Sequence, residues 1–143
     1  MTSNSVGPMT DQAKAAARWA TEESDAERVS FPVVVGAMME AGIERYHADL
    51  VGAVKTYYAP DGSPETFPCH ATGPFGQDFE ASGVEAAVRA IQRQEIAYGE
   101  FCRRIAAAGC VGYFVSMAGK RAIYYGRTGD SHVEWFPSAP GRP

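Results

Sequence analysis

Apolar residues are spaced first at a helical period and then at a strand period, and this order occurs twice along the chain. From Thr10 onward and over 31–42 they recur every three to four residues, which predicts two helices. Alternation with polar residues then predicts strands at 46–50, 54–58 and 65–70. The second occurrence consists of predicted helices at 82–93 and 98–109 and predicted strands at 113–117, 121–125 and 131–136.

The two occurrences are copies of each other, related by an offset of 67 positions without a gap. The segment Ala41–Gly62 superposes on Ala108–Gly129, and six of the seven tyrosines fall into matched positions. The matched pairs are Ala41/Ala108, Gly42/Gly109, Tyr46/Tyr113, Gly52/Gly119, Tyr57/Tyr124, Tyr58/Tyr125 and Gly62/Gly129. An internal repeat of this kind indicates that one structural unit was duplicated.

Each copy has the order helix, helix, strand, strand, strand. We therefore expect an α+β fold with one antiparallel sheet, helices on one face of it, and a local twofold axis between the halves. A parallel sheet is disfavoured because the strands follow one another too closely for crossover helices. The expected boundaries are 1–9 for a flexible tail, about 10–70 and 82–137 for the two repeats of a single domain (10–137), 71–81 for the loop between them, and 138–143 for a second tail.

Local signals mark several helix ends. Pro32 fits the first turn of its predicted helix, and Gly42 fits the left-handed residue that ends it. The tetrapeptides Ser24–Glu27 and Ser82–Glu85 have the form of a capping box. We expect a helix to break and restart at the first of these and another helix to begin at the second.

The pairing register of the two hairpins is predicted from the polarity of Lys55. A two-residue turn would set Lys55 opposite Ala48 on the apolar face of the sheet, whereas a three-residue loop places Thr56 there. We therefore expect the three-residue loop in both copies. The residues then expected on the opposite face are His47, Lys55, Tyr57, Phe114, Ala122 and Tyr124.

The composition narrows the class of protein. Apolar residues make up 45% of the chain and charged residues 21%, with a formal charge of −4, which suits a globular protein and disfavours nucleic acid as a partner. No apolar run approaches the roughly 18 residues of a membrane span and no export signal is evident, so we expect no membrane partner and a cytoplasmic location. The cysteines Cys69, Cys102 and Cys110 lack CxxC spacing, and we expect reduced thiols without disulfides or zinc.

Much of the chain resembles a known family. The residues that carry the resemblance are Ile91-Gln92, Glu95-Ile96-Ala97-Tyr98, Phe101, Ala108-Gly109, Gly112-Tyr113, Tyr124-Tyr125-Gly126, Gly129-Asp130 and Val133-Glu134. They are similar to the YbcV-like family of small bacterial proteins, a domain of unknown function that is sometimes labelled "phage envelope protein". The resemblance extends from about Phe31 to Pro137 and implies no catalytic residue, cofactor or ligand.

Two places carry residue types that are used in catalysis. Cys69 precedes His70, and Cys–His pairing activates a thiolate, but neighbours in a strand point to opposite faces. His132 and Glu134 lie two apart on one predicted strand and share a face, which is a usable geometry for an acid–base pair or half a metal site. Packing and solvent-facing alternation are the simpler explanations of both, and with three histidines and no third ligand we expect no metal and no cofactor.

The repeated tyrosines favour a binding surface. Duplicated units form a concave seam at their axis, and tyrosines there supply apolar walls with a hydroxyl each. The expected ligand-binding residues are Tyr46, Tyr57, Tyr113, Tyr124 and His47. The leading hypothesis is a non-catalytic module that binds a small molecule in the seam or pairs with a second copy as a homodimer.

Two alternatives remain open. One is a small enzyme of unassigned reaction that uses His132 and Glu134, or Cys69, with the loop 71–81 as a lid. The other is a structural protein derived from a phage or a mobile element.

Overall fold

The structure is a computed structural model that describes residues 7–137, so the expected tail 138–143 and most of the tail 1–9 lie outside the described residues. The first half contains α1 (Asp11–Asp25), α2 (Phe31–Ala41), β1 (Arg45–Asp49), β2 (Val54–Tyr58) and β3 (Pro64–Pro68). The second half contains α3 (Ala81–Gln92), α4 (Tyr98–Ala107), β4 (Cys110–Ser116), β5 (Arg121–Gly126) and β6 (Ser131–Trp135). Just before α1, the Met9 N–H donates to Ser63 Oγ at 3.0 Å.

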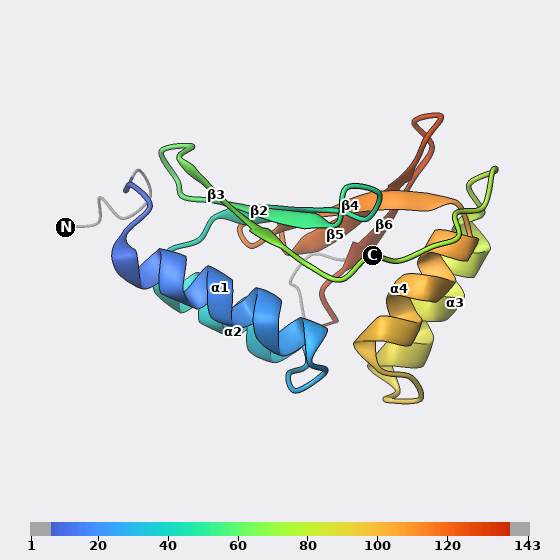
Figure 1. Cartoon of the computed structure of the whole chain (residues 1–143), viewed down its shortest axis with the longest axis horizontal. Coiled ribbons are helices and arrows are strands. Elements are labelled where there is room, and N and C mark those ends of the chain that lie inside the picture. Colours follow the sequence, from blue (N-terminus) through green and yellow to red (C-terminus); the bar gives the residue numbers. More distant parts are fainter. Residues whose placement is uncertain (1–6, 138–143) are drawn as a thin grey trace.

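One six-stranded sheet runs through both halves in the order β3-β2-β1-β4-β5-β6, and every neighbouring pair is antiparallel. All four helices lie on the same face of this sheet, α1 and α2 beneath one half and α3 and α4 beneath the other (Figure 1). The α+β fold and the repeated helix, helix, strand, strand, strand order are therefore confirmed.

The duplication extends to backbone conformation. β3 and β6 have the same length and lie 67 positions apart, as the matched tyrosines do. Left-handed residues recur at the same offset: Glu27/Gln94 (φ 61 and 60), Gly42/Gly109 (84 and 87), Ala53/Lys120 (58 and 55) and Gly62/Gly129 (91 and 89). A positive φ is uncommon for any residue with a side chain, so four shared positions mean that both halves follow one backbone path.

The predicted hairpin register is wrong in both copies. Lys55 lies opposite Ala48, and Ala122 lies opposite Val115, which is the arrangement that the polarity of Lys55 argued against. The turn decides the register, because Asp49 Oδ1 accepts the N–H groups of Val51 and Gly52 at 3.0 and 2.9 Å and closes a four-residue connection. In the other hairpin the matched side chain does the same, since Ser116 Oγ accepts the Gly119 N–H at 2.8 Å.

In the observed register, several side chains lie on the opposite face of the sheet from the one predicted. Lys55, Tyr57, Ala122 and Tyr124, which were expected on the open face, are buried on the face that the helices cover. His47 and Phe114 are on the open face, as expected, with Phe114 42% exposed. A shift of one residue is sufficient for this exchange, because side chains alternate between the two faces of a strand.

Neither predicted capping box forms. Ser24 is buried within the last turn of α1, and the chain turns at left-handed Glu27 instead. Ser82 lies inside α3, whose N-cap is Glu80. The other two helix signals are confirmed, because Pro32 lies in the first turn of α2 and Gly42 ends this helix in the left-handed conformation. At the start of α1, Thr10 Oγ1 accepts the Ala13 N–H at 3.0 Å.

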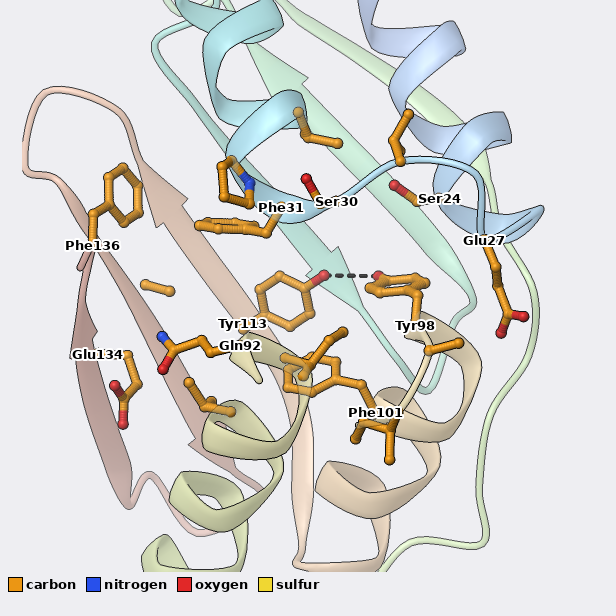
Figure 2. Close-up of a pocket in the computed structure, with 18 of the residues that line it drawn as sticks. Ser24, Glu27, Ser30, Phe31, Gln92, Tyr98, Phe101, Tyr113, Glu134 and Phe136 are labelled. Atoms are coloured by element: carbon orange, nitrogen blue, oxygen red, sulfur yellow. Dashed lines mark hydrogen bonds between the residues drawn. The ribbon is translucent and has the colours of Figure 1, made fainter. Parts of the chain in front are cut away.

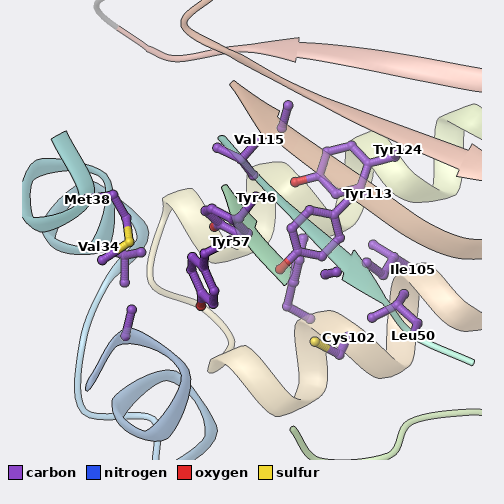
Figure 3. Packing of buried hydrophobic residues seen from close by; sticks show 14 of the residues in the cluster. Val34, Met38, Tyr46, Leu50, Tyr57, Cys102, Ile105, Tyr113, Val115 and Tyr124 are labelled. Carbon is purple, nitrogen blue, oxygen red and sulfur yellow. The ribbon is translucent and has the colours of Figure 1, made fainter. Parts of the chain in front are cut away.

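The core lies between the sheet and the helices (Figure 3). Met38 of α2 and Ile105 of α4 are matched positions, and both are completely buried. Cys102 and Cys110 are buried, and Cys69, Cys102 and Cys110 are free thiols. Within residues 7–137, no helix combines the length and the apolar character needed to cross a membrane.

Candidate functional site

A cavity of about 550 Å³ lies at the seam between the two halves, on the face of the sheet that carries the helices. The sheet forms one side of it, and the connections between α1 and α2 and between α3 and α4 form the others (Figure 2). Because both connections approach the local twofold axis, the cavity is assembled from the same pieces of each repeat. We call it the tyrosine cavity.

Four matched tyrosines line the cavity on the sheet side: Tyr46, Tyr57, Tyr113 and Tyr124. They are 4%, 1%, 4% and 7% exposed. Tyr46 and Tyr57 are cross-strand partners with ring centroids 5.0 Å apart, and Tyr113 and Tyr124 repeat this pairing at 5.2 Å. The Tyr46 and Tyr113 rings meet edge to face at 6.4 Å, so the four rings form one continuous aromatic surface across the axis.

The hydroxyls of these rings differ in their partners. Thr21 Oγ1 donates to the Ala17 carbonyl at 2.9 Å, so its 2.8 Å bond with Tyr57 must be donated by the Tyr57 hydroxyl. The Tyr113 hydroxyl bonds that of Tyr98 at 2.8 Å. Within residues 7–137, no hydrogen bond involves the hydroxyls of Tyr46 and Tyr124, which are open to an occupant.

The tyrosines stay neutral. Burial raises the pKa of Tyr46, Tyr57, Tyr113 and Tyr124 above that of an exposed phenol, because the charged form loses its hydration. The cavity therefore offers hydroxyl groups that can donate or accept a hydrogen bond, and it offers no phenolate base.

Lys55 also lines the cavity and is 3% exposed. Its ammonium nitrogen lies 4.6 Å from the centroid of the Tyr98 ring, and within the described residues it has no ion pair and no hydrogen bond. Burial lowers the pKa of Lys55, and interactions with Cys69, Cys102 and Asp25 oppose this effect. An aromatic face is a weaker partner for an ammonium than a carboxylate, so Lys55 can gain a stronger interaction from an anion in the cavity.

The two ends of the cavity are chemically different although the backbone is symmetric. Matched positions that line it have diverged: Ser24/Ile91, Phe31/Tyr98 and Lys55/Ala122. One end carries Lys55, Ser24 and the Tyr98 hydroxyl, whereas the other carries Phe31 and Phe136 in edge-to-face contact at 5.4 Å. In Figure 2, Phe31 and Phe136 lie on one side of the cavity and Ser24 and Tyr98 on the other.

The structure brings His132 and Glu134 together, with Nε2 and Oε2 2.7 Å apart. The other oxygen of Glu134 accepts from Arg89 at 2.9 Å, and this carboxylate lines the cavity at the end with Phe31 and Phe136. Arg89 and His132 therefore already occupy both oxygens of Glu134, which leaves it little capacity as a general base.

Cys69 lies outside the tyrosine cavity, in a neighbouring hollow that Cys102 and His70 also line. Burial raises the pKa of the Cys69 thiol, and the opposing effect of Lys55 is smaller. His70 is directed toward Asp25, with 3.9 Å between Nε2 and Oδ2. A thiol with a raised pKa is a poor nucleophile at neutral pH.

His47 is separated from the four tyrosines by the sheet. On the open face its Nε2 lies 2.7 Å from the Tyr125 hydroxyl, and its ring lies 4.4 Å from that of Phe114. Burial lowers the pKa of His47, with Asp49 opposing this. Of the five expected ligand-binding residues, the fold thus groups four and places the fifth on the opposite face.

The loop 71–81 is not a lid over the tyrosine cavity. It packs along the end of α4, where the N–H groups of Gly76 and Glu80 donate to the carbonyls of Ala106 and Ala108, both at 2.8 Å. Its first residues line the neighbouring hollow. Across residues 7–137, no three His, Cys, Asp or Glu side chains are grouped as metal ligands.

Sequence reasoning did not assign several residues of this cavity, among them Tyr98 and Lys55. Tyr98 is the one tyrosine without a tyrosine counterpart, and its aromatic match, Phe31, was a usable signal. Lys55 was considered and then assigned to the wrong face, although a lysine within an otherwise apolar strand face is itself unusual.

The fold and the site define the class of the molecule: a duplicated α+β protein with an amphipathic cavity on its local twofold axis. Residues 77–133 match the model of a family described as a protein of unknown function (DUF1398). The match covers less than half of the chain and includes Tyr98, Tyr113 and Tyr124. No curated protein matches the chain.

Proposed function

We propose that this protein is a non-catalytic binding module for a small molecule that occupies the tyrosine cavity. The observation that carries the proposal is a 550 Å³ cavity that holds a buried, unpaired lysine and two unpaired tyrosine hydroxyls. These three polar atoms have no hydrogen-bond partner among the described residues and remain accessible from the cavity, so a ligand can make hydrogen bonds there that the protein does not supply. The volume falls within the roughly 300–1,000 Å³ range of small-molecule sites.

The test is a thermal-shift screen of a fragment library against three proteins. The first is the wild type, and the second is Ala122→Leu, which adds volume to the cavity wall beside Tyr124. The third is Ile123→Leu, the matched control, because residue 123 is the next residue of β5 and faces the opposite side of the sheet. We expect a set of fragments to raise the Tm of the wild type and of the control by at least about 2 °C, because a ligand stabilises the state that it binds.

Those fragments should lose most of their effect on Ala122→Leu. A library that leaves the wild-type Tm unchanged throughout would refute the proposal. So would fragments that shift all three proteins equally, since they would bind elsewhere.

The enzyme alternative has weaker support. Both oxygens of Glu134 already have partners, and burial raises the pKa of the Cys69 thiol. The tyrosine cavity contains neither a metal-ligand cluster nor a free carboxylate among the described residues, which leaves binding as the better explanation of its chemistry.

Several expectations from the sequence stay predictions. Homodimer formation is checked by light scattering, and a cytoplasmic location by cell fractionation. The YbcV-like relationship also stays a prediction, and gene neighbourhood checks the origin in a phage or mobile element.

A further inference from the structure

The charges around the cavity point to the kind of ligand. Four charged side chains line it: Glu27, Arg28, Lys55 and Glu134. Glu27 accepts the Gly99 N–H at 2.9 Å, Arg28 pairs with Glu23 at 2.8 Å, and Glu134 is held by Arg89 and His132. Among the described residues, Lys55 alone of the four has neither an ion pair nor a hydrogen bond.

Lys55 has no charged counterpart in the second repeat. Its counterpart across the twofold axis is Ala122, so the two repeats cannot both present a charge to the cavity. The Tyr98 ring lies against the ammonium, and the matched Phe31 lies at the other end against Phe136. The cavity is therefore asymmetric, with Lys55 and hydroxyls at one end. The other end has Phe31 and Phe136, and Glu134, which is held by Arg89 and His132, lies beside them (Figure 2).

This arrangement specifies both the sign and the number of charges on an occupant. A single buried ammonium is neutralised by a single negative charge, and a second negative charge would be left unpaired in a poorly hydrated site. A carboxylate has two acceptor oxygens, so it can contact the ammonium and a neighbouring hydroxyl together. An aromatic or branched apolar body suits the end formed by Phe31 and Phe136.

We propose that the tyrosine cavity binds small monocarboxylic acids, with the carboxylate at Lys55 and an aromatic body packed against Phe31 and Phe136. This inference rests on the proposed function, because it assigns the ligand class of the same site.

The test uses three probes of the same shape: 3-phenylpropionate, 3-phenylpropan-1-ol and 3-phenylpropylamine. Their dissociation constants are measured by NMR titration on the wild type, on Lys55→Met, and on Lys14→Met as a control on the exposed surface of α1. Methionine keeps most of the lysine side-chain volume and removes the charge, and circular dichroism verifies that each variant is folded.

For the wild type and for Lys14→Met, we expect the acid to bind at least tenfold more tightly than the alcohol and the amine to bind most weakly. For Lys55→Met, affinity for the acid should fall at least tenfold, whereas affinity for the alcohol should change less than threefold.

Failure of this inference can be told apart from failure of the proposed function. If the alcohol or the amine binds the wild type as well as the acid does, or if Lys55→Met keeps the preference for the acid, the cavity binds ligands but the assigned class is wrong. If none of the three probes binds at millimolar concentration while fragments from the library do, the class is wrong as well. If neither probes nor fragments bind, both proposals are refuted.

Discussion

His47 and Phe114 are direct partners in the β1–β4 ladder and are also each other's counterparts in the duplication. The local twofold axis therefore passes between them, where their rings lie 4.4 Å apart on the open face of the sheet. On the other face the same axis meets Tyr46 and Tyr113 and the cavity that they line.

Removing the charge of Lys55 should stabilise the protein. At pH 7 we expect Lys55→Met to raise the free energy of unfolding by about 1 kcal/mol or more, since apolar replacement of a poorly compensated buried charge is often stabilising. Urea unfolding measures this, and Lys14→Met, on the surface, should change the same quantity by less than about 0.5 kcal/mol.

The increase in the free energy of unfolding caused by Lys55→Met should depend on pH. The groups around Lys55 are Tyr98 and Cys102 of α4, Asp25 of α1 and Cys69 beyond β3, and burial is the dominant effect that lowers its pKa. Between this lowered pKa and the ordinary lysine pKa of 10.5, the unfolded chain binds more protons than the folded chain. The free energy of unfolding of the wild type therefore rises with pH in this range, and the advantage of Lys55→Met should shrink. A gap between variant and wild type that stays constant from pH 6 to pH 9.5 would contradict a lowered pKa.

The hydroxyls of Tyr98 and Tyr113 should be energetically coupled. Each single change to phenylalanine leaves the other hydroxyl of the 2.8 Å pair without its partner, and we expect each to cost about 1 kcal/mol of unfolding free energy. The double variant should cost less than the sum, with a coupling of at least about 0.5 kcal/mol in a double-mutant cycle. Tyr58→Phe, on the open face, serves as the control, and strictly additive costs would mean that the bond contributes nothing.

Alanine substitutions at Gly42 and Gly109 should distinguish the cost of backbone strain from the cost of steric overlap. Both are left-handed, with φ of 84 and 87, but a Cβ at Gly42 meets nothing within 4 Å whereas one at Gly109 overlaps the Asp78 carbonyl and comes within 2.8 Å of Phe79 Cα. We expect Gly42→Ala to cost about 1 kcal/mol of unfolding free energy and Gly109→Ala at least about 2 kcal/mol more. Equal costs in urea unfolding would show that the loop 71–81 is not held against α4 as described.

The cysteines should react slowly in the folded protein. Burial raises the pKa of Cys110 to about 11 and also raises that of Cys69 and Cys102, so the thiolate fraction of Cys110 at pH 8 is about one in a thousand. We expect iodoacetamide at pH 8 to label all three rapidly in urea and none rapidly in the native state, as followed by mass spectrometry. Fast native labelling of Cys69 would instead support a nucleophilic role.

The shift at Cys110 also predicts a direction for alkaline stability. Its folded pKa of about 11 exceeds the ordinary cysteine pKa of 9.0, so the contribution of the neutral thiol to stability is complete below about pH 9 and is lost as pH rises toward 11. Cys110→Ala should lose less stability than the wild type between pH 9 and pH 10.5 in urea unfolding.

The sequence by itself determined the duplication, the α+β order and most of the element boundaries. These features depend on neighbours in the chain: the period of apolar residues distinguishes helix from strand, and glycines such as Gly42 and Gly109 mark left-handed ends. The match of Tyr46 with Tyr113 needed no knowledge of the fold, because a duplication leaves its offset in the sequence.

The tertiary structure decided which residues share a face and what the seam contains. The polarity of Lys55 led to the prediction that Lys55 and Tyr57 lie on the open face of the sheet. The turn closed by Asp49 instead fixes a register in which both are buried. A lysine tolerates that position because its ammonium reaches a cavity, and that cavity exists only when α1–α2 and α3–α4 pack side by side under one sheet. Local sequence patterns carry no information about such an enclosed space, since its walls come from segments that are far apart in the chain.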